Sequence, residues 1–267
     1  MVLRKRLRLP GGRTIALMTA AILLVGCGSS AQARPSPSQF SPSPSRLSVL
    51  AFSRTTGFRH DSIPAAIELL RRLGTENGFD VIATEDANTF TDDGLAPFRV
   101  VVFLLTTGTV LDADQRAAFE RYVGRGGGFV GVHSAADTEY DWAWYGDLLG
   151  ARFRTHPTVQ QATINVEDPN HPSTAQLPAQ WVRADEWYDF RSNPRASVHV
   201  LLTVNEATYR GGGMGADHPI AWCHEFGGGR SWYTALGHST ESYSSDQAFA
   251  THLLGGIEWA SGGRGRC

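Results

Sequence analysis

The chain has 267 residues, of which 42% are hydrophobic, and its 24 Lys and Arg residues nearly balance its 26 Asp and Glu residues. Five of the basic residues and none of the acidic ones fall in residues 1–26, so the rest of the chain carries 19 basic against 26 acidic residues, a net charge of −7. Such a chain lacks the excess of positive charge that binds phosphate backbones, and we expect no nucleic-acid partner.

The first 26 residues have the pattern of a targeting signal. A basic segment precedes the apolar run Ile15–Val25, which is too short for a membrane-spanning helix. The sequence Leu24–Cys27 resembles a bacterial lipobox, which predicts removal of residues 1–26 and attachment of a diacylglycerol to the Cys27 thiol. The Pro- and Ser-rich residues 27–46 are predicted to be a flexible tether. We expect an extracytoplasmic protein, anchored by lipid to the bacterial cell membrane; the alternative is an ordinary secretory peptide with an incidental cysteine.

Residues 47–261 are predicted to fold as one α/β domain, followed by a short tail at 262–267. Short apolar runs bounded by turn residues alternate with segments whose apolar residues recur at helical spacing. The first half is predicted to contain strands at 48–52, 79–83, 100–105 and 129–132, and helices at 62–77 and 112–122. This alternation is typical of a mostly parallel, doubly wound sheet with helices on both faces.

The second half of the domain is less regular. It is predicted to contain helices at 142–149 and 249–259, and strands at 159–166, 198–204, 220–225 and 231–235. A run of three glycines joins the last two strands closely enough for a tight connection.

The most informative segment lies at the end of the fourth predicted strand. Three glycines lead into an apolar strand that ends abruptly at His133 and Ser134. Ligands of open α/β sheets bind beyond the carboxyl ends of such strands. The spacing Gly131-x-His133-x-Ala135 has the outline of a nucleophile elbow, with histidine where a nucleophile is expected.

Two further histidines also follow predicted strands. His60 lies in the loop after the first strand, and His238 follows the strand that ends at Ala235. In a parallel sheet His60, His133 and His238 would meet at one rim. Imidazoles there can transfer protons, or with a carboxylate bind a divalent metal ion as candidate cofactor. The competing interpretation is a set of buried, hydrogen-bonded histidines.

A carboxylate and several aromatic side chains complete the predicted site. Glu186 stands in the run Asp185–Tyr188, and sugars pack their C–H faces on aromatic rings. We predict that the substrate-binding residues are His60, Trp142, His156, Trp187 and Tyr188. Half-buried packing in the core is the alternative for the last two.

Cys223 and Cys267 remain once Cys27 is assigned to lipid. An extracytoplasmic compartment permits a disulfide between them, although Cys267 is the terminal residue and could be loose. Neither has the x-x-Cys neighbour typical of a thiolate metal site.

Several motifs, in order along nearly the whole domain, resemble the ThuA-like (trehalose utilisation) family. They are Thr56–Ile63, Gly126–Ser134, Phe153-x-x-His156-Pro157, Asp185–Tyr188, His218-Pro219-x-Ala221-Trp222, Leu236–His238 and Gly256–Ala260. The resemblance implies a flavodoxin-like fold of the class I glutamine amidotransferase type. It also implies that His133 stands where those enzymes have their cysteine, so glutamine hydrolysis is not expected.

The resemblance further implies a role in the catabolism of trehalose or oxidised (keto) sugars. The positions that match family motifs are His60, His133, Ser134, His156, Glu186 and His238. We expect an enzyme, a lyase, hydrolase or isomerase, that removes an acidified C–H proton beside a keto group. His133 and Glu186 would transfer protons, and Ser134 would hydrogen-bond the substrate or hold the His133 tautomer. The alternatives are a non-catalytic sugar-binding lipoprotein and a metal-dependent hydrolase of another substrate class.

Overall fold

The computed structural model describes residues 46–267. The predicted signal peptide, Cys27 and nearly all of the predicted tether lie outside the described residues. The described chain builds one nine-stranded sheet in the order β2-β1-β3-β4-β11-β10-β9-β6-β7, together with a separate two-stranded ladder. The two ends of the large sheet differ in strand direction, and this difference positions the site.

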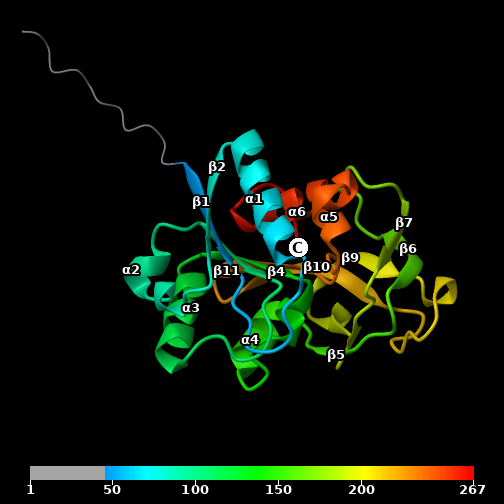
Figure 1. Ribbon diagram of the computed structural model, residues 1–267, viewed down its shortest axis with the longest axis horizontal. Coiled ribbons are helices and arrows are strands. Elements are labelled where there is room, and N and C mark those ends of the chain that lie inside the picture. Colours follow the sequence, from blue (N-terminus) through cyan, green and yellow to red (C-terminus); the bar gives the residue numbers. More distant parts are fainter. Residues whose placement is uncertain (1–45) are drawn as a thin grey trace, which may run out of the picture. The chain divides into compact units, whose positions relative to one another are not determined.

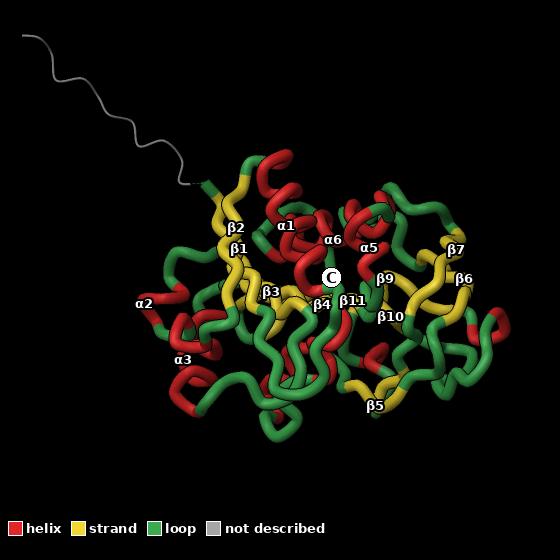
Figure 2. Tube along the Cα trace, viewed as in Figure 1, coloured by secondary structure: helices red, strands yellow, loops and turns green. Residues whose placement is uncertain are grey.

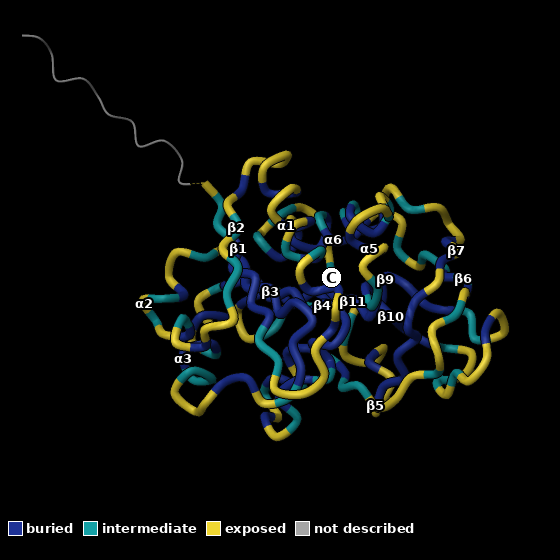
Figure 3. Tube along the Cα trace, in the orientation of Figure 1, coloured by how far each residue is buried: buried dark blue, intermediate teal, exposed yellow. Residues whose placement is uncertain are grey.

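One half of the sheet is parallel. Its strands, in spatial order, are β2 (Phe79–Thr84), β1 (Leu47–Phe52), β3 (Val100–Leu104), β4 (Gly128–Val132) and β11 (Gly229–Thr234) (Figure 1). Every residue of β3 and β4 is buried, as expected for continuous apolar strands covered on both faces. Figure 3 shows this buried centre of the sheet between exposed outer segments.

The other half is antiparallel. It continues from β11 through β10 (Pro219–Phe226), β9 (His199–Val204), β6 (Gln160–Val166) and β7 (Gln180–Asp185). The tight turn predicted between the last two strands is present at Gly227 and Gly228. The edge strand β7 was not predicted, nor was the small ladder of β5 (Phe153–Thr155) and β8 (Asp189–Phe190).

Helices cover both faces of the sheet, which confirms the predicted α/β fold class. Figures 1 and 2 show α1 (Ile63–Asn77), α5 (Thr240–Ser244) and α6 (Gln247–Ala260) on one face, and α3 (Ala113–Gly124) and α4 (Ala143–Leu149) on the other. The short helix α2 (Asp92–Leu95) packs on α3. The remaining helical turns are η1 (Ala87–Thr89), η2 (His133–Asp137), η3 (Pro194–Ala196) and η4 (Glu206–Thr208).

Local sequence signals set the helix ends. Helix α1 ends at Gly78, whose left-handed conformation (φ 79°) returns its N–H to the carbonyl of Gly74. Helix α3 begins with a capping box in which Asp112 and Gln115 each accept the other's backbone N–H. Both predicted helices are therefore present close to their expected bounds.

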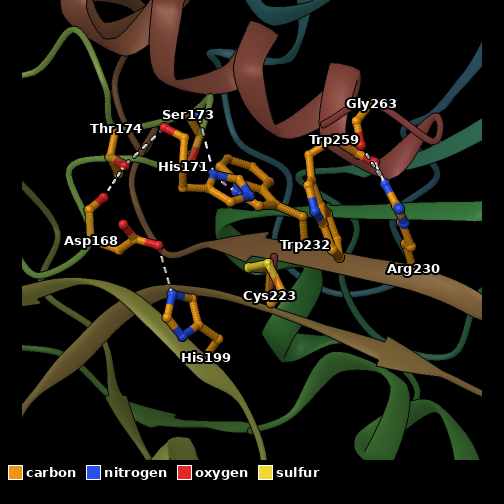
Figure 4. Close-up of a disulfide and its surroundings, with 11 residues drawn as sticks. Asp168, His171, Ser173, Thr174, His199, Cys223, Arg230, Trp232, Trp259 and Gly263 are labelled. Atoms are coloured by element: carbon orange, nitrogen blue, oxygen red, sulfur yellow. Dashed lines mark hydrogen bonds and ion pairs between the residues drawn. A yellow bond between two sulfur atoms is a disulfide. The ribbon is translucent and has the colours of Figure 1, made fainter. Parts of the chain in front are cut away.

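A disulfide joins Cys223 on β10 to Cys267 (Figure 4). Their Cα atoms are 5.6 Å apart, and the bond lies beside the rings of Trp232 and Trp259. Because Cys267 follows α6, which packs on β4 and β11, the bond ties the antiparallel half of the fold to the covering of the parallel half. Within residues 46–267 no helix combines the length and the hydropathy that crossing a bilayer requires.

Candidate functional site

Three histidines from distant parts of the chain lie together at the carboxyl ends of the parallel strands. The ring centroids of His60 and His133 are 4.8 Å apart, those of His60 and His238 are 5.3 Å apart, and those of His133 and His238 are 5.4 Å apart. His60 follows β1, His133 follows β4 and His238 follows β11. The parallel arrangement of these strands brings the histidines to one rim, as the sequence analysis predicts for such a sheet.

The backbone at His133 is held in an uncommon conformation. Its φ of 51° lies in the left-handed region, which a bulky residue adopts only when its surroundings impose it. The Tyr233 hydroxyl donates to the His133 carbonyl at 2.9 Å. A Cβ on Gly131 would lie 3.0 Å from the Tyr233 ring, so glycine allows this close approach. The turn aims the imidazole at the cluster.

The hydrogen bond on one side of the His133 ring determines what the other side presents. Nδ1 lies 2.6 Å from the carbonyl oxygen of Ala235, which can only accept, so Nδ1 carries a proton. In the neutral ring Nε2 then has a lone pair. That fully buried atom has no hydrogen-bond partner, and it lies 3.4 Å from Glu186 Oε2.

Glu186 is the carboxylate at the centre of the cluster. Its Oε2 lies 3.3 Å from His238 Nδ1, and its Oε1 lies 3.1 Å from His156 Nδ1. His238 Nδ1 is also buried and has no hydrogen-bond partner. We call His60, His133, Glu186 and His238 the His–Glu cluster.

Asp185 holds two segments of this cluster in register. Its Oδ1 accepts the backbone N–H of Glu186 at 2.9 Å and of His238 at 3.1 Å, and its Oδ2 accepts that of Gly237 at 3.0 Å. The Arg183 guanidinium, 3.0 Å from Oδ2, balances its charge. Asp185 thus links the end of β7 to the loop after β11.

The electrostatics of the cluster favour a neutral His60 and an ionised Glu186. Burial, aided by the neighbouring His133 and His238, lowers the pKa of His60 to about 3. Burial by itself raises the pKa of Glu186, but the close approach of His133 and His238 to its carboxylate outweighs burial and holds that pKa well below its usual range. The Glu186 carboxylate in turn raises the pKa of His238, against the opposing effect of burial.

The donor set of the His–Glu cluster fits a divalent metal ion. Each residue offers one ligand atom, and the four atoms lie within 4.8 Å of one another. Three imidazole nitrogens and one carboxylate oxygen suit Zn²⁺ and related transition-metal ions. The buried, unpartnered nitrogens of His133 and His238 are the atoms that such an ion would satisfy.

Two other groups of metal-binding residue types occur within the described chain. In the first, the buried His171 Nε2 has no hydrogen-bond partner, but its neighbouring ligand atoms are not free. The sulfurs near His171 are joined in the disulfide. In the second group, Glu206 Oε1 lies 2.8 Å from His218 Nδ1, and Asp189 accepts from Arg154 and from the Gly213 N–H. We interpret both as structural.

A cleft of about 200 Å³ opens beside the His–Glu cluster. It is lined by Phe58, His60, Asp137, Phe153, His156, Glu186, Tyr188 and His238. A larger cavity, of about 670 Å³, lies among Ser48, Arg99 and Gly127 at the amino ends of the strands. We assign the chemistry to the smaller cleft, because it alone of the two borders the cluster.

Two of the predicted sugar-binding aromatics, Trp142 and Trp187, do not line this cleft. Trp142 packs against Trp144 and Tyr145, and its indole N–H donates to Glu120. Trp187 is 1% exposed and donates to the Gln160 carbonyl. Each indole N–H has its hydrogen-bond partner away from the cleft, and neither ring borders it.

The other predicted residues are at or behind the cleft. Tyr188 and His156 line it, and the Tyr188 ring lies 4.3 Å from that of His133. Ser134 is fully buried, and its Oγ lies 3.5 Å from His60 Nδ1, so it contacts the cluster from behind.

Three lining residues were not predicted as site residues. Phe58, two positions before His60, is 67% exposed and lies at the mouth of the cleft. Asp137 lies four residues after His133 on the helical turn η2, and Phe153 begins β5. Their proximity in sequence to His60, His133 and His156 was the available signal.

Comparison with known proteins places the whole domain in one group. The sequence profile described as ThuA, trehalose utilisation, matches residues 48–260. A ThuA-like protein from Bacteroides uniformis is 26% identical with a TM-score of 0.69, and the alignment covers 84% of this chain and 94% of that one. A second from Parabacteroides merdae is 21% identical with a TM-score of 0.67, covering 84% and 93%. No curated protein matches the sequence.

Proposed function

Because the chain belongs to the ThuA (trehalose utilisation) family, we propose that it is an enzyme of carbohydrate metabolism that works with a divalent metal ion bound by the His–Glu cluster. One observation supports the metal above all. Two buried imidazole nitrogens, in His133 and His238, have no hydrogen-bond partner and lie 3.4 and 3.3 Å from one oxygen of Glu186. A lone pair facing a carboxylate is repulsive unless a cation lies between them.

The cation is a metal ion or a proton, and the composition of the cluster favours the metal. A proton would satisfy one nitrogen at a time. A metal ion satisfies three imidazoles and the carboxylate together, and requires neutral histidine. The pKa of His60, lowered to about 3, keeps that ring neutral near pH 7.

The residues around the cleft suit a small, polar substrate. A divalent ion in the cluster would supply a Lewis acid that polarises a carbonyl or hydroxyl oxygen. The rings of Phe153 and Tyr188, 4.3 Å apart, offer an aromatic wall for the C–H face of a sugar. The exposed His156 offers a hydrogen-bonding group beside Glu186. A keto-sugar derivative fits this combination, because a polarised keto oxygen acidifies the neighbouring C–H bond.

This arrangement changes the roles proposed from sequence for His133 and Glu186. Both would serve first as ligands, with their lone pairs taken up by the metal. Proton transfer to or from the substrate then needs another group that borders the cleft.

The metal is tested by zinc titration calorimetry on protein freed of metal with a chelator. We expect one Zn²⁺ per chain, no stoichiometric binding by His133→Ala, and unchanged binding by His199→Ala, which removes a half-exposed histidine on β9. Failure of the parent protein to bind zinc, or equal binding by His133→Ala, would contradict the proposal.

The activity is tested on trehalose and a panel of keto-glycosides, with and without chelator. We expect turnover that chelator abolishes and zinc restores. Tight sugar binding without turnover, in zinc-loaded protein, would instead favour the non-catalytic sugar-binding lipoprotein.

The proposed location is extracytoplasmic, with Cys27 carrying lipid and residues 27–46 as the tether. It is supported by the lipobox-like sequence and agrees with the disulfide, which an oxidising compartment permits. A Cys27→Ala protein should leave the membrane fraction of expressing cells. Its retention there would exclude the lipid anchor.

A further inference from the structure

Asp137 borders the cleft and is not a member of the His–Glu cluster. It ends the helical turn η2, which begins at His133, and its backbone carbonyl accepts the N–H of Gly108 at 2.9 Å. This bond fixes the end of the turn, so the carboxyl group is held in place at the cleft wall. Within residues 46–267 the only side chain that hydrogen-bonds with it is Tyr140.

The two hydrogen-bond contacts of the Tyr140 hydroxyl bear on the protonation of Asp137. Its hydroxyl oxygen lies 2.7 Å from Asp137 Oδ1 and 3.0 Å from the carbonyl oxygen of Phe153. A hydroxyl has one proton to donate, and a carbonyl oxygen can only accept. Unless that one proton is shared between two acceptors, both contacts are hydrogen bonds when the hydroxyl donates to Phe153 and accepts a proton from Asp137. The geometry therefore fits a protonated Asp137 carboxyl.

We propose that Asp137 is the proton-donating residue of the cleft, an inference that rests on the proposed function, and that the Tyr140 hydroxyl stabilises it both with and without its proton. The cluster would hold the substrate on one wall of the cleft. Asp137 would serve the oxygen of the substrate that gains a proton.

The charges around Asp137 agree with this role. Burial raises its pKa, while the Tyr140 hydroxyl, Arg191, His133 and His156 oppose that rise. Arg191 comes from the segment after β8 and lies over the Tyr140 ring, 4.2 Å from its centroid. A carboxyl group with a raised pKa is a better proton donor at neutral pH than an exposed aspartic acid, and enzymes tune acids in this way.

The proposed transfer moves one proton between Asp137 and the substrate, with Tyr140 as the hydrogen-bonding partner of Asp137. Asp137 gives its proton to a substrate oxygen, and the O–H bond of the carboxyl breaks as the new O–H bond forms. The carboxylate that remains gains the Tyr140 hydroxyl as a donor, because that hydroxyl rotates its one proton from the Phe153 carbonyl to Asp137. Return of a proton from the substrate or from water resets the pair. Arg191 lies close enough to stabilise the charge.

Carboxyl ¹³C NMR of metal-free protein labelled at aspartate tests the inference without a substrate. Asp137→Asn identifies the signal of Asp137, and Asp141→Asn, at an exposed position nearby, must leave that signal in place. We expect the Asp137 signal to titrate above the ordinary aspartate value of about 3.9. In Tyr140→Phe the midpoint should rise further, because the hydroxyl binds the charged carboxylate more strongly than the neutral carboxyl. A midpoint at or below 3.9, or one that Tyr140→Phe does not move, would overturn the proposal.

Zinc titration of Asp137→Asn separates this inference from the proposed function. We expect its zinc affinity to equal that of the parent protein. Loss of zinc by this variant would make Asp137 a ligand and overturn its assignment as proton donor. If the parent protein itself binds no zinc, the metal proposal fails, and the NMR titration still decides the protonation of Asp137.

Discussion

The parallel and antiparallel halves of the sheet make different contributions to the same site. The parallel half, β2 to β11 in spatial order, supplies all three histidines of the His–Glu cluster from the ends of its strands. The antiparallel half supplies the carboxylate, because Glu186 directly follows β7, the last strand of the sheet. The candidate metal site therefore lies between the parallel and the antiparallel half of the sheet. It forms only when both halves are correctly placed.

The difference shows what each kind of sheet does for a site. Parallel strands all end at one rim, so residues far apart in sequence meet there without further contacts. Antiparallel strands reverse direction at each turn, so Glu186 needs separate support. Asp185 provides it by binding the backbone of both segments.

The largest effect we expect, on the free energy of unfolding, comes from removing the disulfide that links the two halves. The double variant Cys223→Ala, Cys267→Ala opens a loop of 44 residues, which chain-entropy arguments value at about 4 kcal/mol. Chemical denaturation should show a loss of about that free energy of unfolding, and reduction of the parent protein should produce the same shift. A change below about 1 kcal/mol would mean that the two halves hold together without the bond.

Removing the carboxylate should be as damaging as removing a histidine. We expect Glu186→Gln to weaken zinc binding by more than about 100-fold, since it removes a direct ligand and loss of an indirect one already costs 10–100-fold. Glu225→Gln, at an exposed position on β10, is the matched control in calorimetry. Normal zinc affinity in Glu186→Gln would place the metal in the parallel half alone.

A smaller effect on zinc affinity should follow from weakening the contact that Asp185 makes between the end of β7 and the loop after β11. Asp185→Asn keeps the shape of the side chain but removes the negative charge of the carboxylate, whose oxygens accept three backbone N–H groups. Zinc affinity should fall by about 10–100-fold with the fold retained by circular dichroism. Asp168→Asn alters a carboxylate that contacts His199 and the Asn170 N–H, away from the cluster, and should leave zinc affinity unchanged. An unaltered affinity in Asp185→Asn would show that the segments are positioned by other contacts.

The smallest expected effect is a loss of folding stability at acidic pH. His252 on α6 packs on Trp232 of the parallel half, and burial lowers its pKa to about 3. Above pH 6.5 neither the folded nor the unfolded state binds a proton there. Below it, the unfolded state does and the folded state does not, so stability falls by up to about 1.4 kcal/mol per pH unit. Denaturation in chelator at pH 7 and pH 5 should show a shallower pH dependence for His252→Gln; an unchanged slope would exclude this contribution.

The sequence predicts the two halves unequally well. The strands of the parallel half are continuous apolar runs such as Val100–Leu104, and their direction follows from the alternation with helices. His60, His133 and His238 could therefore be selected before any coordinates. Edge strand β7 alternates buried and exposed residues and contains the charged Arg183. This pattern does not indicate which strand it pairs with.

Aromatic side chains show the same limit of prediction from sequence, here for single residues. Tyr188 borders the cleft while the adjacent Trp187 is buried, and their sequence context is shared. Which ring faces a ligand depends on distant partners such as the Gln160 carbonyl, which accepts the Trp187 N–H. Asp137 needed the structure for a similar reason, because its significance comes from the hydroxyl proton of Tyr140.

The most direct test of the account is a crystal structure of the zinc-loaded protein with anomalous data at the zinc absorption edge. We predict one strong peak within about 2.0–2.2 Å of a ring nitrogen of each of the three histidines and of a Glu186 oxygen. A fully loaded crystal with no peak at the His–Glu cluster, or with its peak elsewhere, would contradict the central claim.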